Sequence, residues 1–313
     1  MKRDYDFEEL GRTSGFDPKQ LEKACRISDL LEDVSNVVFL RDRLSLYGGT
    51  ALAFIHLDEV LRLSIDLDFN YRHLNEEDWG TVRDRIDDRI KRLLYAQEYG
   101  EEELAVQATY PLGRIVVQYE NHLGVNDSFM IEIGYMRRIP ILPRDIIAPF
   151  RHIATGEKYP IKTPQPEELC ANKWCTLLYR GSSRDLFDVY QISKKDFDED
   201  TFRKCAVVDS LMRGPPRLHE VDAEETLGRI PIDSALRNLL LTDAGRYDFK
   251  EVRRDVIEFT KKFLDQLTPI ERKTINRFHE ERRFIPESMD PEGVLHEKIR
   301  EHPMIIRALS VLR

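Results

Sequence analysis

Apolar and polar residues alternate over residues 64–70. The apolar positions of this stretch are Ile65, Leu67 and Phe69. Because successive side chains of a β-strand point to opposite faces, the alternation predicts a strand with one face in a hydrophobic core. Asp66 and Asp68 then lie together on the opposite face, roughly 6.6 Å apart along the strand.

Two aspartates on one strand face predict a cation site. Carboxylates this close repel each other unless a cation lies between them. A pair of Mg²⁺ ions about 3.5–4 Å apart suits this spacing, and Mg²⁺ prefers oxygen ligands. The alternative interpretation is that Asp66 and Asp68 lie on a solvated strand edge.

A pair of glycines precedes this strand. Gly48 and Gly49 end a short apolar strand, and a helix over residues 50–60 is predicted to begin near Thr50. Bare backbone at a helix N-terminus lets a phosphate approach closely. A phosphate site followed by an Asp-x-Asp strand is typical of a metal-dependent nucleotidyltransferase. The alternative is a Gly-Gly turn without a function.

Two side chains near the aspartates are further candidates for nucleotide binding. Arg62 precedes the strand and has the fork geometry that binds a γ-phosphate in a bidentate manner. Ser64 shares the face of Asp66 and Asp68, so its hydroxyl is placed to bond the phosphates. Solvated side chains without a role remain the alternative for both.

Hydrophobic periodicity predicts more elements in the first half of the chain. They are a helix that begins at Pro18 behind the N-cap Asp17, a helix over 79–95, and strands over 114–119 and 128–135. Glu132 lies on the polar face of the last of these strands. Two metal ions need more anionic oxygens than two aspartates provide, so Glu132 is the candidate third ligand. A half-exposed strand glutamate fits the pattern equally well.

The second half of the chain is almost wholly helical in pattern. A proline-rich stretch over residues 140–166 predicts a linker between domains. The helices predicted beyond it cover 167–180, 184–194, 199–212, 222–230, 232–242, 248–266, 268–283 and 303–313. We therefore predict an α+β protein with an α/β catalytic domain over residues 1–160, a helical domain over 161–313 and an active site in the cleft between them.

A lysine in the first of these helices stands on an apolar face. Lys173 shares that face with Leu169 and Leu177. An ammonium there is costly unless an anion meets it, and the triphosphate of a nucleotide is such an anion. A lysine that reaches solvent at the domain edge is the alternative.

Charged residues at the start of the next helix have a structural interpretation. Ser183 is the predicted N-cap, and Asp185 is favourable in the first helical turn. Asp185 and Asp188 would then do no more than cap the helix and pair with Arg180.

Composition limits the class of protein. The 313 residues are 41% hydrophobic, which allows a sizeable core and two domains. The four cysteines have no C-x-x-C spacing, which indicates reduced, buried thiols and neither zinc ligands nor a disulfide framework. The sequence has no secretion signal and no apolar run near 18 residues, so we predict a cytoplasmic protein without a membrane span.

The charge balance disfavours an unaided nucleic-acid binder. The net charge is −9, whereas such proteins usually have a positive face. Charged residues of both signs make up 34% of the chain, so a local basic surface is still compatible with the total. The basic residues that we expect around the site are Arg62, Arg72, Arg137, Arg138 and Lys173.

Two blocks of the chain together resemble one family. Residues 48–52 read GGTAL and residues 62–69 read RLSIDLDF. Lys173, Leu177 and Arg180 are followed by RDLFDVY over residues 184–190. Both blocks, in this order, closely resemble the AbiEii-type (MenT-like) nucleotidyltransferase toxins of type IV toxin–antitoxin systems.

This resemblance implies a fold, a reaction and a set of residues. The fold would be a polymerase-β-like nucleotidyltransferase domain with a mixed sheet, followed by a helical domain. One of Asp185 and Asp188 would face the site and orient Lys173 or the acceptor hydroxyl. The implied nucleotide-binding residues are Gly48, Gly49, Thr50, Arg62, Ser64 and Lys173, and the implied metal ligands are Asp66, Asp68 and Glu132.

The expected activity is Mg²⁺-dependent transfer of a nucleoside monophosphate from an NTP to an acceptor hydroxyl. By resemblance the acceptor would be the 3′ end of a tRNA, which stops translation, and the partner would be a cognate antitoxin. A small-molecule or protein acceptor is the alternative enzyme activity. A non-catalytic module that binds a nucleotide or a partner is the alternative from another class.

Overall fold

The computed structural model describes residues 3–73, 77–109, 111–241 and 247–311. The chain folds into two compact units. The first contains Met1–Arg138, Ile146–Thr163 and Asn238–Ala244. The second contains Ile139–Asp145, Pro164–Arg237 and Gly245–Arg313.

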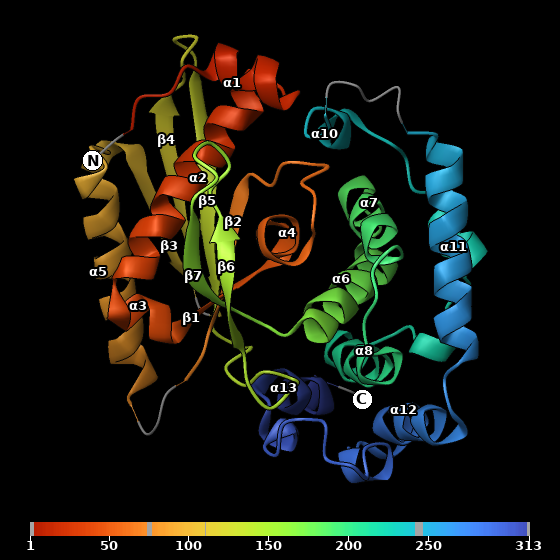
Figure 1. The fold of residues 1–313 in the computed structure, drawn as a ribbon. Helices are drawn as coiled ribbons and strands as arrows, with labels where there is room; N and C mark the ends of the chain where they lie inside the picture. The colour runs from red at the N-terminus through yellow and green to blue at the C-terminus, as the bar shows by residue number, and fades with distance from the viewer. Residues whose placement is uncertain (1–2, 74–76, 110, 242–246, 312–313) are drawn as a thin grey trace. The chain divides into compact units, whose positions relative to one another are not determined.

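A mixed sheet forms the centre of the first unit (Figure 1). Its strands are β1 (Leu44–Tyr47), β2 (Asp66–Tyr71), β3 (Leu104–Thr109), β4 (Leu112–Glu120) and β5 (Asn126–Gly134). They lie in the order β1-β2-β5-β4-β3. The β2–β5 pair is parallel and the other pairs are antiparallel. This mixed sheet, with the helices of the second unit, confirms the predicted α+β class.

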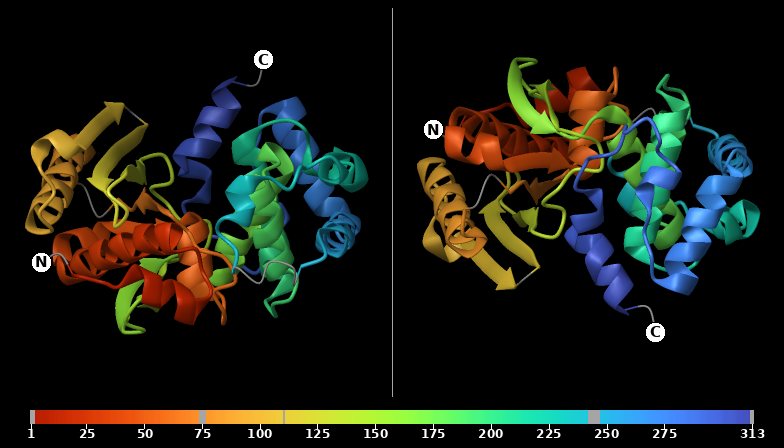
Figure 2. Two further views of the ribbon diagram at one scale, coloured as in Figure 1. Left: turned by 90° about the horizontal axis from the view of Figure 1, so that it is seen from above. Right: turned by 90° about the horizontal axis from the view of Figure 1, so that it is seen from below.

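Helices pack beside this sheet. They are α1 (Phe7–Ser14), α2 (Pro18–Asn36), α3 (Val38–Arg43), α4 (Gly48–Ala51), the π-helix η1 (Leu52–His56), α5 (Trp79–Ala96) and the 3-10 helix η2 (Glu101–Glu103). As predicted, α2 begins at Pro18, and the Asp17 side chain accepts a hydrogen bond from the Gln20 amide at 3.0 Å. The helices α2 and α5 pack against each other beside the sheet (Figures 1 and 2), and their apolar residues, such as Ile27 and Ile86, are buried.

A hairpin occupies part of the proline-rich stretch that was expected to be a linker. Its strands are β6 (Ile146–Arg151) and β7 (Lys158–Thr163), and it belongs to the first unit. Proline is tolerated in these two strands because they form a sheet of their own, with Pro149 opposite Pro160. The hairpin was not predicted because it lacks a regular alternation of apolar and polar residues.

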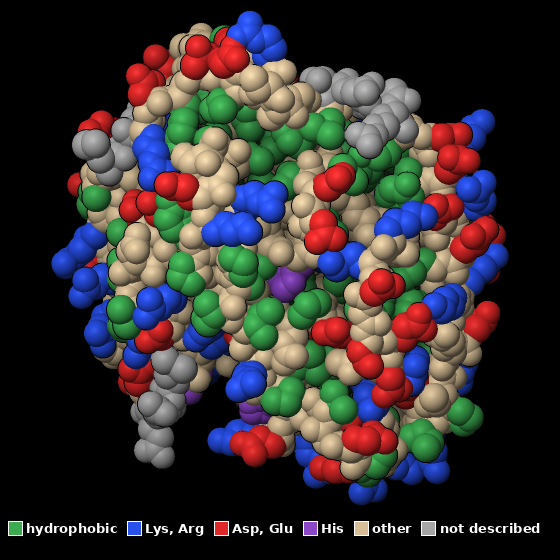
Figure 3. All heavy atoms as spheres, in the orientation of Figure 1, with side chains coloured by type: hydrophobic (Ala, Val, Ile, Leu, Met, Phe, Trp, Pro, Cys, Tyr) green, Lys and Arg blue, Asp and Glu red, His purple; other side chains and the backbone are tan. Residues whose placement is uncertain are grey.

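The second unit is helical. Its elements are α6 (Pro166–Arg180), α7 (Ser183–Ile192), α8 (Glu199–Arg213), η3 (Leu218–Glu220), α9 (Ala223–Gly228), α10 (Ser234–Arg237), α11 (Phe249–Asp265), α12 (Pro269–Glu281), η5 (Pro286–Ser288), η6 (Ile299–Glu301) and α13 (Pro303–Val311). The buried Trp174 of α6 packs against Phe202 of α8 and Phe263 of α11. Over these helices, acidic and basic side chains are interspersed on the surface (Figure 3).

The predicted helices differ from the observed ones mainly in length. The helix expected over 50–60 ends at His56, and the one expected over 232–242 covers only Ser234–Arg237. Residues 242, 312 and 313, at the ends of two predicted helices, lie outside the described residues. Among the described residues, no helix is both long and apolar enough to cross a membrane.

A buried carboxylate joins α6 to the loop that precedes it in the second unit. Glu168 Oε2 accepts hydrogen bonds from the backbone amides of Ile141 at 2.9 Å and Leu142 at 3.0 Å. Glu168 is buried, so removing its oxygen would leave these buried amides without this acceptor.

We therefore expect Glu168→Ala to lower the free energy of unfolding by about 2–6 kcal/mol, because each of the two orphaned amides costs about 1–3 kcal/mol. Glu168→Gln keeps an acceptor oxygen and should cost less than half as much. Denaturant titration followed by circular dichroism measures both values. Equal losses in the two variants would show that the charge, and not the acceptor, stabilises this loop.

Candidate active site

The two predicted carboxylates lie on the same face of β2. Asp66 and Asp68 are half-buried, and Leu67 and Phe69 between and beyond them are buried in the core. The alternation expected from the sequence is therefore confirmed, and the strand begins two residues later than predicted. The pairing of β2 with β1 on one side and with β5 on the other fixes the direction of both carboxylates.

The backbone of Gly48 lies against the carboxylate of Asp68. A Cβ atom at residue 48 would be 2.1 Å from Asp68 Oδ2, and Gly48 has a φ of +70°. Both observations require glycine, because an L side chain would be strained there and would overlap the carboxylate. The chain leaves β1 at this residue and enters α4, so the start of the helix and the carboxylate are in direct contact.

Three other predicted nucleotide-binding residues meet beside Gly49. A Cβ atom at residue 49 would be 2.8 Å from Arg62 Nη2 and 2.9 Å from Ser64 Oγ. Thr50 Oγ1 lies 2.9 Å from Ser64 Oγ and 2.5 Å from the carbonyl oxygen of Asp66. The α4 start and the 62–66 segment therefore form one compact group.

Glu132 on β5 lies next to Asp68 in the sheet. The parallel register pairs Asp68 with Glu132, and the antiparallel register pairs Glu132 with Arg114 on β4. Arg114 Nε and Nη2 donate to Glu132 Oε1 at 2.8 and 2.5 Å. Glu132 thus stands in the same row as Asp68 and is held from the far side by an arginine.

Arg114 is the residue of this group that the sequence analysis missed. It was assigned to a strand, but nothing in a single sequence indicates which residue of the neighbouring strand it faces. The register between β4 and β5 brings Arg114 to Glu132, and this register depends on tertiary packing.

A second group of predicted residues lies in the second unit. Lys173 Nζ is 2.9 Å from Asp188 Oδ2 and 4.0 Å from Asp185 Oδ1, and all three side chains are buried. The Asp188 carboxylate offsets the free-energy cost of burying the Lys173 ammonium on an apolar helix face. The alternative of a lysine that reaches solvent is therefore wrong.

The two aspartates of α7 have different partners. Arg180 Nε and Nη2 donate to the two oxygens of Asp185 at 2.9 and 2.8 Å, and Ser182 Oγ also donates to this carboxylate. Asp188 is the closer partner of Lys173. The N-cap is Ser182, whose hydroxyl accepts from the Asp185 amide, so the prediction of Ser183 as N-cap is wrong. Ser183 instead donates to Asp233 Oδ1 at 2.6 Å.

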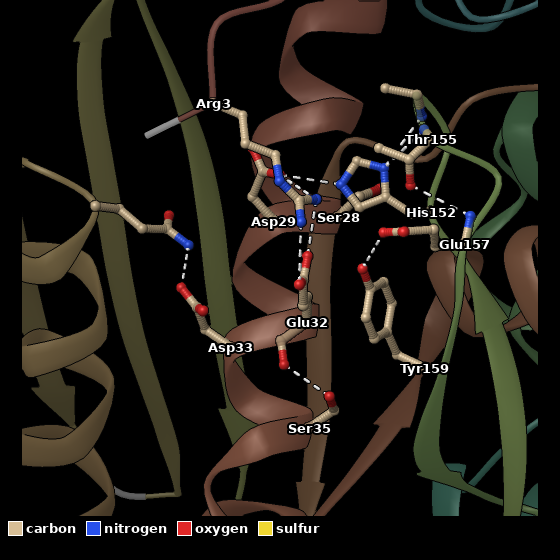
Figure 4. Close-up of polar contacts among 12 residues, drawn as sticks. Arg3, Ser28, Asp29, Glu32, Asp33, Ser35, His152, Thr155, Glu157 and Tyr159 are labelled. Carbon is tan, nitrogen blue, oxygen red and sulfur yellow. Dashed lines mark hydrogen bonds and ion pairs between the residues drawn. The ribbon is translucent and has the colours of Figure 1, made fainter. Parts of the chain in front are cut away.

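Another group of residues of the kinds that bind metal ions lies elsewhere in the first unit. Asp29, Glu32 and His152 bring ligand atoms within 4.8 Å of one another, the one such group among the residues that the structure describes. Figure 4 shows the Arg3 side chain at Asp29 and Glu32, and Arg3 Nη1 lies 2.8 Å from Glu32 Oε2.

The histidine of this group does not have the proton arrangement of a metal ligand. His152 Nδ1 accepts from the amides of Ala154 and Thr155 at 3.2 and 3.3 Å. The ring proton is then on Nε2, which lies 3.0 Å from Asp29 Oδ1. The group therefore ties the N-terminal segment and the β6–β7 turn to α2, with Arg3 as its cation.

Among the described residues, the cysteines belong to no such group of metal-binding residue types. All four are free and buried. Burial raises the pKa of the Cys170 thiol to about 12 and the pKa of the Cys205 thiol well above its usual value. Both thiols therefore stay protonated at neutral pH, and the predicted burial of the cysteines is confirmed.

The basic residues expected around the site are mostly buried. Arg62 and Arg72 have exposed fractions of 3% and 5%, and Lys173 is also buried. Arg137 and Arg138 are half-buried, and Arg72 Nη1 donates to the Arg137 carbonyl at 2.6 Å. Of the expected group, Arg137 and Arg138 are thus the two with side chains accessible to a partner.

Comparison with known proteins connects this arrangement to a family. The family model described as nucleotidyl transferase AbiEii toxin, type IV TA system, matches residues 29–287. MenT4, a nucleotidyltransferase toxin from Mycobacterium tuberculosis H37Rv, has a similar structure, with a TM-score of 0.65 over 99% of this chain and 100% of that chain. The two sequences are 19% identical, so this likeness shows the fold. No curated protein matches the chain in sequence.

The match to the family model covers most of the chain and contains both groups of site residues. The chain therefore belongs to the AbiEii family, the nucleotidyltransferase toxins of type IV toxin–antitoxin systems.

Proposed function

We propose that this nucleotidyltransferase transfers a nucleoside monophosphate from an NTP to an acceptor hydroxyl. The acceptor oxygen would form a bond to the α-phosphorus, the α–β phosphoanhydride bond would break, and pyrophosphate would leave. One observation carries the proposal: the start of α4 is in direct contact with the Asp68 carboxylate of β2, since a Cβ atom at Gly48 would be 2.1 Å from Asp68 Oδ2. A phosphate at the helix start is then next to the acidic pair.

The group around Gly49 is the proposed phosphate site. The backbone amides of Gly49 and Thr50 lie at the start of α4. Residue 49 has no side chain that would keep a phosphate away from these amides. Arg62 lies against Gly49, where its guanidinium would neutralise the terminal phosphate. Ser64 would bond a phosphate oxygen, and its position is set by the contact with Thr50.

The donor set on the sheet suits Mg²⁺. Asp66, Asp68 and Glu132 offer carboxylate oxygens only, and the latter two are adjacent in register. When bound, Mg²⁺ would neutralise phosphate charge and favour ionisation of the acceptor hydroxyl. Arg114 fixes Oε1 of Glu132, so Oε2 is the oxygen that Glu132 would direct to an ion.

We propose that Lys173 serves the same reaction by stabilising the charge that develops on pyrophosphate. Asp188 would orient the ammonium, since it is the closer carboxylate at 2.9 Å. Asp185 would hold the start of α7 through Arg180 and Ser182. This assignment gives Asp188 the functional role and Asp185 the supporting one.

The proposed acceptor is the 3′ end of a tRNA, and membership of the family implies an antitoxin as partner. Arg137 and Arg138, which directly follow the β5 strand of Glu132, are the proposed contacts for the RNA backbone.

The burial of Arg62 and Arg72 favours a second candidate, a small-molecule or protein acceptor, because these residues add nothing to an exposed basic surface.

The first prediction tests the sheet carboxylates. Asp66→Asn should lower kcat by at least about 10²–10³-fold, because transition-state charge loses its counter-charge. The unfolding midpoint should not fall, since removing one of two adjacent carboxylates relieves repulsion. Rates of labelled NTP incorporation into total tRNA, at several Mg²⁺ concentrations, measure this effect. Asp88→Asn, an exposed aspartate on α5, is the control. Full activity of Asp66→Asn would contradict the metal role.

The second prediction separates the chemical and structural roles of the buried ion pair. Lys173→Ala alone should cost about 3–5 kcal/mol of stability, because it removes the ammonium that lies 2.9 Å from the buried Asp188 carboxylate. The double variant Lys173→Met with Asp188→Leu should recover most of that stability and still transfer no nucleotide. Thermal unfolding and single-turnover kinetics measure the two properties. If the double variant is active, the pair is only structural.

The third prediction concerns the acceptor. Arg137→Glu with Arg138→Glu should weaken tRNA binding and reduce the slope of log K against log salt by about 0.7 to 0.9 for each lost phosphate contact. NTP binding should stay within about twofold. The control variant replaces the exposed Arg229 and Arg254 of the second unit with glutamate, which reverses their charge. Unchanged tRNA modification, or equal transfer to a small alcohol, would favour the second candidate.

A further inference from the structure

A short segment from the second half of the chain belongs to the catalytic unit. Residues 238–241 are part of the first unit, although the helix α10 before them belongs to the second. The side chains of Leu239 and Leu240 have exposed fractions of 2% and 1%. Two buried leucines therefore belong to a unit that is otherwise built, apart from their immediate neighbours in sequence, from residues 1–138 and 146–163.

This segment pairs with the backbone just before the catalytic strand. The Leu63 amide donates to the Leu239 carbonyl at 2.8 Å, and Arg62 forms an antiparallel β-bridge with Leu240. These contacts form a single antiparallel pairing step of the kind that repeats along a β-sheet.

The pairing occurs where the central sheet does not reach. The register of β1 with β2 ends at Tyr47 and Asp68, and the register of β5 with β2 ends at Asp66. Residues 57–65 lie outside named strands, and their β-bridge among the described residues is the one with Leu240. The Leu239–Leu240 pair therefore aligns the backbone of Arg62 and Leu63.

The position of Arg62 follows from this alignment. Its Nη1 donates to the Leu63 carbonyl at 2.9 Å, and its Nη2 lies where a Cβ atom at Gly49 would be only 2.8 Å away. The guanidinium therefore depends on the same two residues whose backbone the segment holds. Ser64 follows directly and contacts Thr50.

We propose that Leu239 and Leu240 are positioning residues for nucleotide binding. They hold residues 62–63 in an extended conformation, so that Arg62 is presented to the triphosphate beside Gly49. The inference rests on the proposed role of Arg62 as a phosphate ligand. It assigns to the second half of the chain a direct part in the shape of the nucleotide site.

The test is a double-mutant cycle between Leu240 and Arg62. Leu240→Ala should raise KM about tenfold for whichever of the four Mg-NTPs is the substrate, with kcat changed less than about threefold, because Arg62 is displaced and not removed. Arg62→Ala should raise KM by at least as much. The double variant Arg62→Ala with Leu240→Ala should be no worse than Arg62→Ala alone. Leu240→Met, which keeps the buried volume, should restore KM.

Hydrogen exchange gives a readout that does not depend on activity. The Leu63 amide should exchange faster in Leu240→Ala, since its acceptor is Leu239. The matched control is Leu94→Ala, which removes a fully buried leucine from α5. It should lower thermal stability by a similar amount and leave both KM and Leu63 exchange unchanged.

The outcomes distinguish a failure of the proposed phosphate role of Arg62 from a failure of the positioning role of Leu239 and Leu240. If Arg62→Ala leaves KM unchanged, the proposed phosphate role of Arg62 is wrong. If Arg62→Ala raises KM but Leu240→Ala does not, or if the two effects are additive, the positioning role of the Leu239–Leu240 segment is overturned. An effect of Leu94→Ala as large as that of Leu240→Ala would also overturn it.

Discussion

The arrangement of the candidate site depends on one steric constraint, the absence of a side chain at residue 48. The chain turns from β1 into α4 directly against the carboxylate of Asp68, where a Cβ atom would be 2.1 Å from Oδ2. Only glycine allows this approach, and its φ of +70° sends the next residues into the helix. Thr50 can then reach the carbonyl of Asp66, and Gly49 comes against Arg62 and Ser64. The acidic pair and the helix start are thus parts of one structure.

The features that could be predicted from the sequence are those set by local periodicity. The alternation around Asp66 and Asp68 predicted β2 and the shared face of the two carboxylates, because burial of Leu67 and Phe69 leaves only one orientation. Helices such as α5, α6 and α11 were predicted close to their observed bounds for the same reason, with a period of 3.6 residues. Each of these features is determined by residues close together in the sequence, so a single sequence is enough to predict it.

The features that could not be predicted depend on contacts between distant residues. Nothing near Arg114 shows that it faces Glu132, since the register of β4 and β5 is a property of the folded sheet. The Leu239–Leu240 pair is too short for any periodicity and meets its partners, Arg62 and Leu63, only in the folded chain. The different partners of Asp185 and Asp188 could not be predicted for a similar reason. It is Arg180, at the end of the preceding helix, that engages Asp185 and leaves Asp188 as the closer carboxylate to Lys173.

In the proposed reaction, the buried ion pair of Lys173 and Asp188 would keep a cation ready for a phosphate inside a protein that is acidic overall. An ammonium has three N–H donors, and a single carboxylate at 2.9 Å does not use them all. Asp188 therefore offsets the cost of burying the charge and restricts the rotation of the side chain, while donors stay available to a second anion. An arginine would not be equivalent here, because its planar fork would match the carboxylate in a bidentate manner and direct its donors to Asp188. A lysine with one close aspartate at 2.9 Å and a second at 4.0 Å would thus be suited to share its charge with a departing pyrophosphate.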